Sequence, residues 1–275
     1  MYEPVGYWEK LLNDRPGLAG VADPSQAEFA LARSYRVVRR NAFRLLRDHG
    51  LRRLDGCHVL DVGSGSGYWL STWHESGARS VTGIELTSVG SERLRRTHDY
   101  AKVLQGDVGA ETFDLAGKYD LISAMSVMLH IVDDAAFRRA LGRLAEALAP
   151  QGTLLVADPV LTRRDTRLPP APGDNSVARP LREWQEASSA VGLEIVAVRA
   201  STVLQGNPID VRDARNLSRL NRLWWEFGRL QRRAPSPVAK GVVNLTALAD
   251  QALTHVPAPA ISSKLMLLRR IGTDV

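Results

Sequence analysis

Val59-Leu60-Asp61-Val62-Gly63-Ser64-Gly65-Ser66-Gly67 is the stretch of this sequence that decides the fold. Its apolar residues are typical of a strand that is buried on both faces, as in a parallel sheet. The three glycines at alternate positions let the chain turn with positive φ angles and let a ligand approach the backbone closely. Residues 68–76 can then form a helix whose first N–H groups point at the same place. The stretch therefore predicts a strand, a ligand-binding turn and a helix.

The spacing of the glycines argues against a phosphate-binding turn. The dinucleotide fingerprint is G-x-G-x-x-G and a P-loop ends in Gly-Lys-Ser/Thr, whereas this turn reads G-x-G-x-G with Asp61 two residues before the first glycine. A carboxylate at the mouth of the turn suits a cationic ligand better than a pyrophosphate. The segment resembles motif I of the class I S-adenosylmethionine (SAM)-dependent methyltransferases. The alternative is a glycine-rich turn that holds no ligand.

The composition bounds the class of protein. A chain of 275 residues fits one large α/β domain, or one domain with a cap. The net charge of +6 could indicate a nucleic-acid partner. However, only five of the basic residues are lysines, and the arginines are spread along most predicted helices, which favours solvated helix faces. The sequence shows no signal peptide and no apolar run long enough to span a bilayer. We expect a soluble, cytoplasmic protein that binds neither membranes nor nucleic acid.

Strands and helices alternate along most of the chain, which is the rhythm of a doubly wound, parallel α/β sheet. Periodicity alone predicts no more than that. Strands are predicted over 58–62, 80–85, 101–105, 119–124, 152–157, 193–204 and 262–271. Helices are predicted around 7–12 and over 26–48, 68–76, 88–98 (capped by Ser88), 133–148 (capped by Asp133 or Asp134), 181–191 and 242–253, with another helix earlier in the stretch 211–255 and a loop over 160–180.

The methyltransferase resemblance makes the architecture more specific. It implies a mostly parallel seven-stranded sheet of order 3-2-1-4-5-7-6, in which strand seven is antiparallel. It also implies N-terminal helices and a helical insertion before the last strand. In this interpretation residues 1–50 form a helical cap, residues 51–204 and 259–275 form the SAM-binding core, and residues 205–258 form a second cap.

Further residues fit the cofactor that the resemblance implies. Glu85 ends the second strand, 24 residues after Asp61, and a carboxylate there can accept hydrogen bonds from both ribose hydroxyls. The resemblance assigns the adenine amino group to Asp107 and a ring nitrogen to the N–H of Val108. It assigns the methionine amino group to Asp61. The remaining expected cofactor contacts are Gly63, Ser64, Gly65, Leu86, Ala124, Met125 and Tyr35, the last of these toward the methionine carboxylate.

His130 is the candidate general base, since a neutral histidine can take a proton from an oxygen or nitrogen acceptor near neutral pH. It lies in Ser126-Val127-Met128-Leu129-His130-Ile131-Val132-Asp133, which resembles the Leu-His-His-Ile-x-Asp stretch of many small-molecule methyltransferases. A structural or cofactor-adjacent role is the alternative. For the acceptor pocket we expect His130 and four aromatic residues, although Trp224 also fits a helix core: Tyr7, Trp8, Trp224 and Trp225.

The sequence thus predicts a SAM-dependent methyltransferase of a small molecule in secondary metabolism, with S-adenosylhomocysteine (SAH) as product. The acceptor atom is oxygen or nitrogen, with carbon as a third option. The alternatives are an RNA or protein methyltransferase and a non-catalytic SAM-binding protein. Asp133 and Asp134 fit helix capping better than metal binding, so we expect no metal. The sequence leaves a monomer and a homodimer both open.

Overall fold

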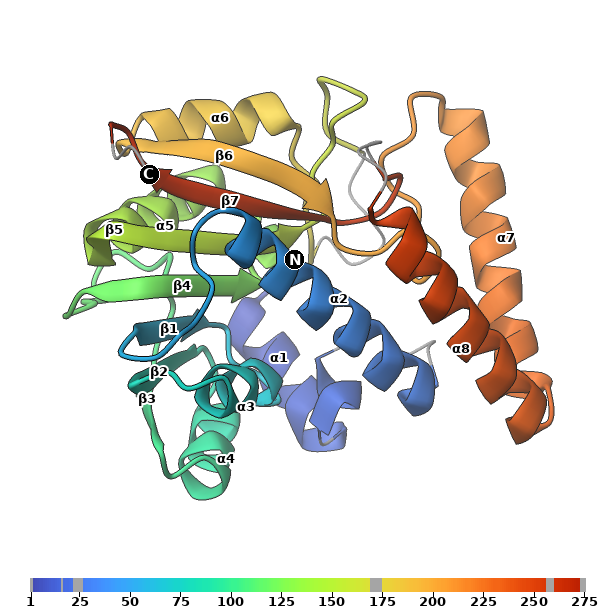
Figure 1. Cartoon of the computed structure of the whole chain (residues 1–275), viewed down its shortest axis with the longest axis horizontal. Coiled ribbons are helices and arrows are strands. Elements are labelled where there is room, and N and C mark those ends of the chain that lie inside the picture. Colours follow the sequence, from blue (N-terminus) through green and yellow to red (C-terminus); the bar gives the residue numbers. More distant parts are fainter. Residues whose placement is uncertain (1, 16, 22–26, 169–174, 256–259, 273–275) are drawn as a thin grey trace.

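A computed structural model describes residues 2–15, 17–21, 27–168, 175–255 and 260–272. Its centre is a seven-stranded sheet of order β3-β2-β1-β4-β5-β7-β6 (Figure 1). Strands β1 to β5 pair in parallel, whereas β7 runs antiparallel to both β5 and β6. The order and the antiparallel last strand are therefore confirmed. The strands are β1 His58–Val62, β2 Ser80–Glu85, β3 Ala101–Gln105, β4 Tyr119–Met125, β5 Leu148–Asp158, β6 Leu193–Ala200 and β7 Lys264–Arg270.

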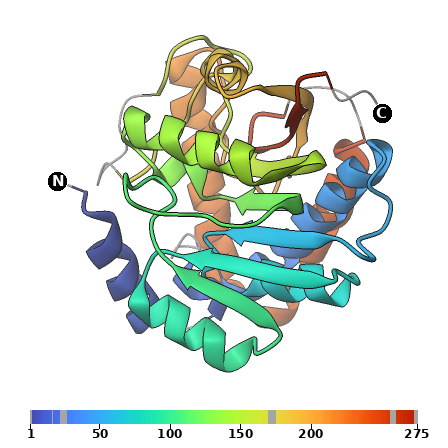
Figure 2. The ribbon, with the colours of Figure 1, turned by 90° about the vertical axis from the view of Figure 1, so that its left-hand side faces the viewer.

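Helices cover both faces of the sheet, and α1 stands apart beside α4 (Figure 2). On one face α2, α3 and α4 form one apolar cluster with the strands, and on the other face α5 and α6 form a second. The helices are α1 Pro4–Asp14, α2 Glu28–Asp48, α3 Tyr68–Glu75, α4 Ser88–Thr97, α5 Asp134–Ala147, α6 Leu181–Ser189, α7 Ala214–Arg233 and α8 Ser236–Leu253, with the 3-10 turns η1 Gly17–Gly20 and η2 Met128–His130.

The alternation of side chains along β1 explains this double burial. Leu60 and Val62 enter the cluster beneath α5 and α6, and Val59 enters the cluster beneath α2 and α3. All three side chains are at most 1% exposed. Successive side chains of a strand point to opposite faces, so Asp61 lies on the same face as Val59. Asp120, near the start of β4, accepts a hydrogen bond from His58 N at 2.8 Å, which joins the starts of β1 and β4.

Several predicted boundaries were wrong. The cap of α4 is Thr87 rather than Ser88, because its hydroxyl accepts the hydrogen bond from Gly90 N. The second insertion helix begins at Ser236 rather than 242, since Pro237 in its first turn favours a helix start. Strand β6 ends at Ala200, where its partner β7 begins at Lys264. Strand β5 already begins at Leu148, next to an irregularity in its pairing with β4.

The two insertion helices form a hairpin at the edge of the molecule. Helix α8 lies along α2, and α7 lies outside α8 (Figure 1). No residue of α7 whose side chain is described is buried. No helix in the described part of the chain is long and apolar enough to cross a membrane. Of the predicted loop over 160–180, residues 169–174 lie outside the described residues, and the remainder up to Arg179 contains no helix or named strand.

Candidate functional site

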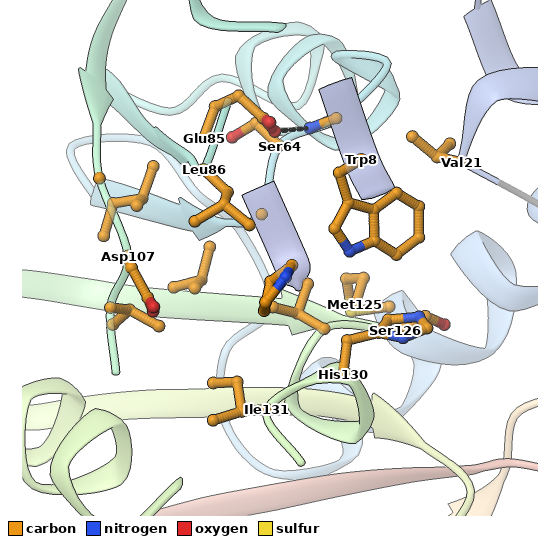
Figure 3. A pocket seen from close by; sticks show the side chains of 18 of the residues that line it. Trp8, Val21, Ser64, Glu85, Leu86, Asp107, Met125, Ser126, His130 and Ile131 are labelled. Atoms are coloured by element: carbon orange, nitrogen blue, oxygen red, sulfur yellow. Dashed lines mark hydrogen bonds between the residues drawn. The ribbon is translucent and has the colours of Figure 1, made fainter. Parts of the chain in front are cut away.

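A cavity of about 370 Å³ lies at the carboxyl ends of β1, β2, β3 and β4. Its other side is made by α1 and by the segment that follows β4. Figure 3 shows Glu85, Leu86 and Asp107 on one side of it and Trp8, Val21 and His130 on the other. Ligands of open α/β sheets bind at this end of the strands, so the cavity is the candidate active site.

The glycine turn forms the floor of the cavity. Gly63 and Gly65 have φ angles of +66° and +49°, which side-chain-bearing residues rarely adopt. A Cβ atom on Gly63 would lie 2.5 Å from Cγ2 of Val127, and one on Gly65 would lie 2.7 Å from Cγ1 of Val21. The glycines are therefore needed both for the backbone angles of the turn and for the close packing of Val127 and Val21 against it. Ser64 lines the cavity between them.

Glu85 lines the cavity and is only 4% exposed. Its Oε2 accepts a hydrogen bond from Gly65 N at 2.9 Å, and its Oε1 accepts two from Thr87, from N at 3.0 Å and from Oγ1 at 2.8 Å. The carboxylate thus joins the glycine turn to the start of α4. Leu86, the next residue, also lines the cavity.

Asp107 and Val108 follow β3 and line the cavity together. Asp107 Oδ1 accepts a hydrogen bond from Gly109 N at 2.7 Å, which fixes an Asp turn, and the side chain is otherwise exposed. Val108 is 5% exposed and joins the core beneath α5. The carboxylate of Asp107 can accept a hydrogen bond from an adenine amino group, and the N–H of the neighbouring Val108 can donate one to a ring nitrogen.

Asp61 does not line the cavity but lies directly behind the glycine turn, at 1% exposure. Its Oδ1 accepts a hydrogen bond from Ser123 Oγ at 2.7 Å, and Trp73 Nε1 donates to the same hydroxyl at 2.9 Å. Its Oδ2 has no hydrogen-bond partner among the described residues. Burial raises the pKa of this carboxyl to about 7. Such a group gains from a cation placed nearby.

The other predicted cofactor contacts are divided between the cavity and the core. Met125 lines the cavity, whereas Ala124 is fully buried behind it. Tyr35, on α2, lines the cavity, with its ring 4.8 Å from that of Tyr68. Burial raises the pKa of Tyr35 to about 12, so its hydroxyl stays protonated and can donate a hydrogen bond.

His130 closes the turn η2 and lines the cavity opposite the cofactor residues. Its Nδ1 lies 2.6 Å from the carbonyl oxygen of Asn175. A carbonyl can only accept, so Nδ1 carries the proton and Nε2 of the neutral ring keeps a lone pair. Burial lowers the pKa of His130, which favours this neutral form. Its ring meets the ring of Trp8 edge-on, with the centroids 4.8 Å apart.

Residues 175–179, here called the strap, hold the turn that carries His130. Val177 N donates to Leu129 O at 2.8 Å. Arg179, whose side chain is 2% exposed, donates from Nη2 to Ile131 O at 2.8 Å and from Nη1 to Met128 O at 3.3 Å. The strap therefore contacts every residue from 128 to 131.

Sequence reasoning missed Arg179 and Asn175, since nothing local to them indicates a contact with a segment 45 or more residues away. It also missed Asp158 as a neighbour of the site. Asp158 is 1% exposed at the end of β5, and neither carboxylate oxygen is hydrogen-bonded to a described residue. Burial raises its pKa well above the ordinary value, and the nearby Arg179 charge opposes this only in part.

Ser126, directly after β4, has a φ angle of +61° and lines the cavity. It is the one residue other than glycine with a positive φ among the described residues. Its N–H donates to Ala157 O at 2.7 Å, which holds it in this conformation. Strained backbone of this kind often occurs at functional sites.

The structure separates the aromatic residues that we expected in the acceptor pocket. Trp8 lines the cavity, and Tyr7 beside it does not and is 41% exposed. Trp224 and Trp225 line a different cavity of about 40 Å³ between α2 and the insertion helices. Tyr2, which the sequence did not indicate, lines the main cavity and accepts a hydrogen bond from Trp8 Nε1 at 3.1 Å.

The two aspartates at the start of α5 hold protein groups. Asp133 caps the helix, because its Oδ1 accepts a hydrogen bond from Ala136 N at 2.7 Å. Asp134 pairs with Arg167 at 2.8 Å and with Arg179 at 3.1 Å. In the part of the chain that the structure describes, no three His, Cys, Asp or Glu side chains are grouped as metal ligands.

Residues 34–226 match the family model described as a methyltransferase domain. The chain belongs to this family. With the sheet order above, it is a class I, SAM-dependent methyltransferase fold, and the resemblance of its motif I is confirmed. SAM is the cofactor of this family. The match begins inside α2 and ends inside α7, so it includes parts of both predicted caps.

Curated relatives match only part of the methyltransferase chain. Ubiquinone biosynthesis O-methyltransferase of Rhodopseudomonas palustris strain BisA53 is 32% identical over 113 residues, which is 39% of this chain and 42% of that protein. The chain thus spans less than half the length of this relative. The likeness supports the family and leaves the acceptor open.

Solved structures show the fold over most of the methyltransferase. An O-methyltransferase from a trans-AT PKS multienzyme of Brevibacillus brevis, in complex with SAH, has a TM-score of 0.54 at 18% identity and covers 88% of this chain and 74% of its own. The cyclase SpnF has a TM-score of 0.51 at 17% identity, covering 84% of this chain and 81% of its own. At these identities the likeness is one of fold, and the cyclase shows that this fold also hosts other reactions.

The residues around the cavity fit SAM. The orphaned Oδ2 of Asp61 lies behind the turn where the cationic methionine part would sit. The turn that lines the cavity carries no side chain at Gly63 or Gly65, so a ligand can approach its backbone closely. Glu85 and Asp107 offer carboxylates at the ends of neighbouring strands, as ribose and adenine require.

Proposed function

We propose that this methyltransferase transfers a methyl group from SAM to an oxygen or nitrogen atom of a small molecule. The observation that carries the proposal is the position of His130. Its Nδ1 is bonded to Asn175 O, so Nε2 is the nitrogen left to take a proton. The ring lines the same cavity as Glu85 and Asp107, across from them. The histidine nitrogen that can take a proton and the residues of the cofactor site thus lie at the same cavity.

The strand ends would hold the cofactor. Asp61 would hold the methionine amino group, through its unpartnered Oδ2 or a water molecule, and Gly63, Ser64 and Gly65 would lie against the same part. Glu85 would accept from the ribose, and Asp107 and Val108 would contact adenine. SAM, when bound, supplies the methyl group of its sulfonium. The electron pair of the broken carbon–sulfur bond stays on sulfur as SAH forms.

The chain would contribute alignment and proton removal. The acceptor would lie against Trp8 and His130, and Nε2 of His130 would take the proton that the acceptor loses. Alignment of two reactants in a closed site is worth up to roughly 7–11 kcal/mol in favourable systems. The lowered pKa of His130 keeps the ring neutral and ready to accept at neutral pH.

The cavity favours a small acceptor over RNA or protein. Helix α1 and the segment 125–133 form one side of it, and its volume is that of small-molecule sites. The O-methyltransferase names of the relatives agree with oxygen as the acceptor atom. We further propose that residues 1–50 and 205–258 act as caps, that the enzyme works in the cytoplasm without a nucleic-acid partner, and that its product belongs to secondary metabolism.

The test is methyl transfer from radiolabelled SAM into three separate fractions: small metabolites, total RNA and protein. We expect label in the small-metabolite fraction. Label in RNA or protein alone would contradict the proposal, and no label in any fraction, with SAM bound, would favour a non-catalytic protein. The variant His130→Gln should lower turnover about 100-fold or more with unchanged SAM affinity. Unchanged turnover between pH 6 and pH 9 would remove His130 as the base.

A further inference from the structure

We propose that the acceptor enters the cavity as an uncharged aromatic ring, and that the site excludes acceptors with a carboxylate, sulfate or phosphate near that ring. This inference rests on the proposed methyl transfer to a small molecule and names the class of that molecule. Two features of the cavity carry it, the shape of its aromatic side and the sign of its charged groups.

The aromatic side is built by α1 and the turn η2. Trp8 meets His130 edge-on at 4.8 Å, with an angle of 79° between the ring planes. The indole N–H of Trp8 is already bonded to Tyr2 Oη, so the rest of the indole offers only carbon surface. Leu12 and Ile131 line the cavity as well. A flat ring can stack on these rings or meet them edge-on, the geometries that aromatic pairs favour.

The charged side chains that line the cavity in the described part of the chain are acidic. Glu85, Asp107 and Asp133 line it, and no lysine or arginine in the described part of the chain does so. With Glu85 and Asp107 turned to the cofactor, Asp133 is the charged lining residue left on the acceptor side, and an anionic acceptor would come near it with no lysine or arginine of the lining to pair with.

The basic character of the chain lies elsewhere. The net charge is +6, yet the arginines gather on exposed helix faces such as that of α7, none of whose residues lines the cavity. The arginines of that helix are Arg215, Arg219, Arg222, Arg229, Arg232 and Arg233. The positive charge that could have suggested an acidic substrate thus belongs to residues that do not line the cavity.

A pair of probes that differ only in charge tests the inference. They are para-coumaramide and para-coumarate, titrated by calorimetry into the full chain saturated with SAH. We expect the neutral amide to bind at least about tenfold more tightly, since like charges placed close together repel each other. Equal affinities, tighter binding of the carboxylate, or binding of neither probe would overturn the inference.

Two variants locate the cause. Asp133→Ser removes a charge from the cavity lining and keeps a residue that caps α5. The ratio of the affinity for the amide to the affinity for the carboxylate should therefore fall several-fold. Trp8→Ala should weaken amide binding about tenfold, whereas Trp225→Ala, at the separate cavity beside α2, should not. An unchanged preference in Asp133→Ser together with full amide binding in Trp8→Ala would contradict the assignment.

These binding measurements need no turnover, so they separate the two proposals. Methyl transfer into small metabolites combined with tight binding of para-coumarate would sink the inference and leave the proposed function standing. Charge-selective binding of the probes without any methyl transfer would contradict the proposed function and leave the inference about the cavity standing.

Discussion

The two sides of the cavity are built in different ways. The strand-edge side consists of the glycine turn, Glu85 and Asp107, each of which directly follows or ends a strand of one sheet. The helical side consists of α1, the turn η2 and the strap, which are joined by contacts between segments far apart in the sequence. The strand-edge side suits a constant ligand such as a cofactor, and the helical side can vary with the acceptor.

The largest effect is expected on the strand-edge side. Asp61→Asn removes the buried charge that would face the methionine amino group. Hydrogen bonds to charged groups contribute about 1.5–3 kcal/mol, so SAM affinity at pH 8 should fall roughly 10–100-fold in calorimetry.

Asp120→Asn is the matched control for that change. Asp120 lies one strand away and bonds to His58 N at the other end of the sheet. The SAM affinity of this variant should stay within about twofold of the unaltered chain, because Asp120 lies near the start of β4, at the opposite ends of the strands from the cavity. Equal losses in both variants would show that the effect is structural and not a contact with the cofactor.

On the helical side the strap should control turnover and not cofactor binding. Arg179→Met removes the bonds to Met128 O and Ile131 O and lets the His130 ring shift. We expect the turnover number to fall about tenfold or more, because small displacements of a catalytic group are costly. The nitrogen shifts of His130 in NMR should show a smaller population with the proton on Nδ1.

Arg182→Met is the control for the strap. Arg182 lies three residues further on and makes an exposed pair with Glu186. Its removal should leave both turnover and the NMR signature as they are. If Arg179→Met lost SAM affinity as strongly as turnover, the strap would support both sides of the cavity and the division would be wrong.

The pH dependence of cofactor binding follows from Asp61. Burial raises its pKa to about 7, so the carboxyl is mostly neutral at pH 6 and mostly ionised at pH 8. A cationic amino group binds the ionised form, so SAH affinity should weaken about tenfold from pH 8 to pH 6. The difference between the unaltered chain and Asp61→Asn, titrated in parallel, isolates this carboxyl. If the SAH affinity of both proteins changed equally with pH, the Asp61 carboxyl would have no part in binding.

The smallest effect concerns the backbone at Ser126. Glycine adopts its φ of +61° without a steric penalty, so Ser126→Gly should raise the free energy of unfolding by up to about 1 kcal/mol. Ser126→Ala keeps the strain and removes only the hydroxyl, and it should not be stabilised. If urea titration showed both variants equally stable, the strain at this position would be negligible.

The strand-edge side was largely readable from the sequence, because its signals are local. The spacing of glycines and the carboxylates at strand ends indicated Glu85 and Asp107 correctly as neighbours of one cavity. Asp61 shows the limit of that reasoning. Its place in the strand puts the side chain on the face beneath α3, bonded to Ser123, so it lies behind the cavity and not in its lining.

The helical side was not readable in the same way. An aromatic residue in a helical stripe shows that the helix packs, and it does not show against what. Trp8 and Trp224 therefore looked alike in sequence, yet they line different cavities. Asn175 and Arg179 gave no signal at all, since their role depends on where the loop after β5 returns to the sheet.

The most direct test of this division is the affinity for SAH of two variants measured side by side by calorimetry at pH 8. Asp61→Asn changes the strand-edge side, and Trp8→Ala changes the helical side. We predict a loss of about tenfold or more for Asp61→Asn and a change within about twofold for Trp8→Ala. Similar losses in the two variants, or a greater loss in Trp8→Ala, would contradict the account.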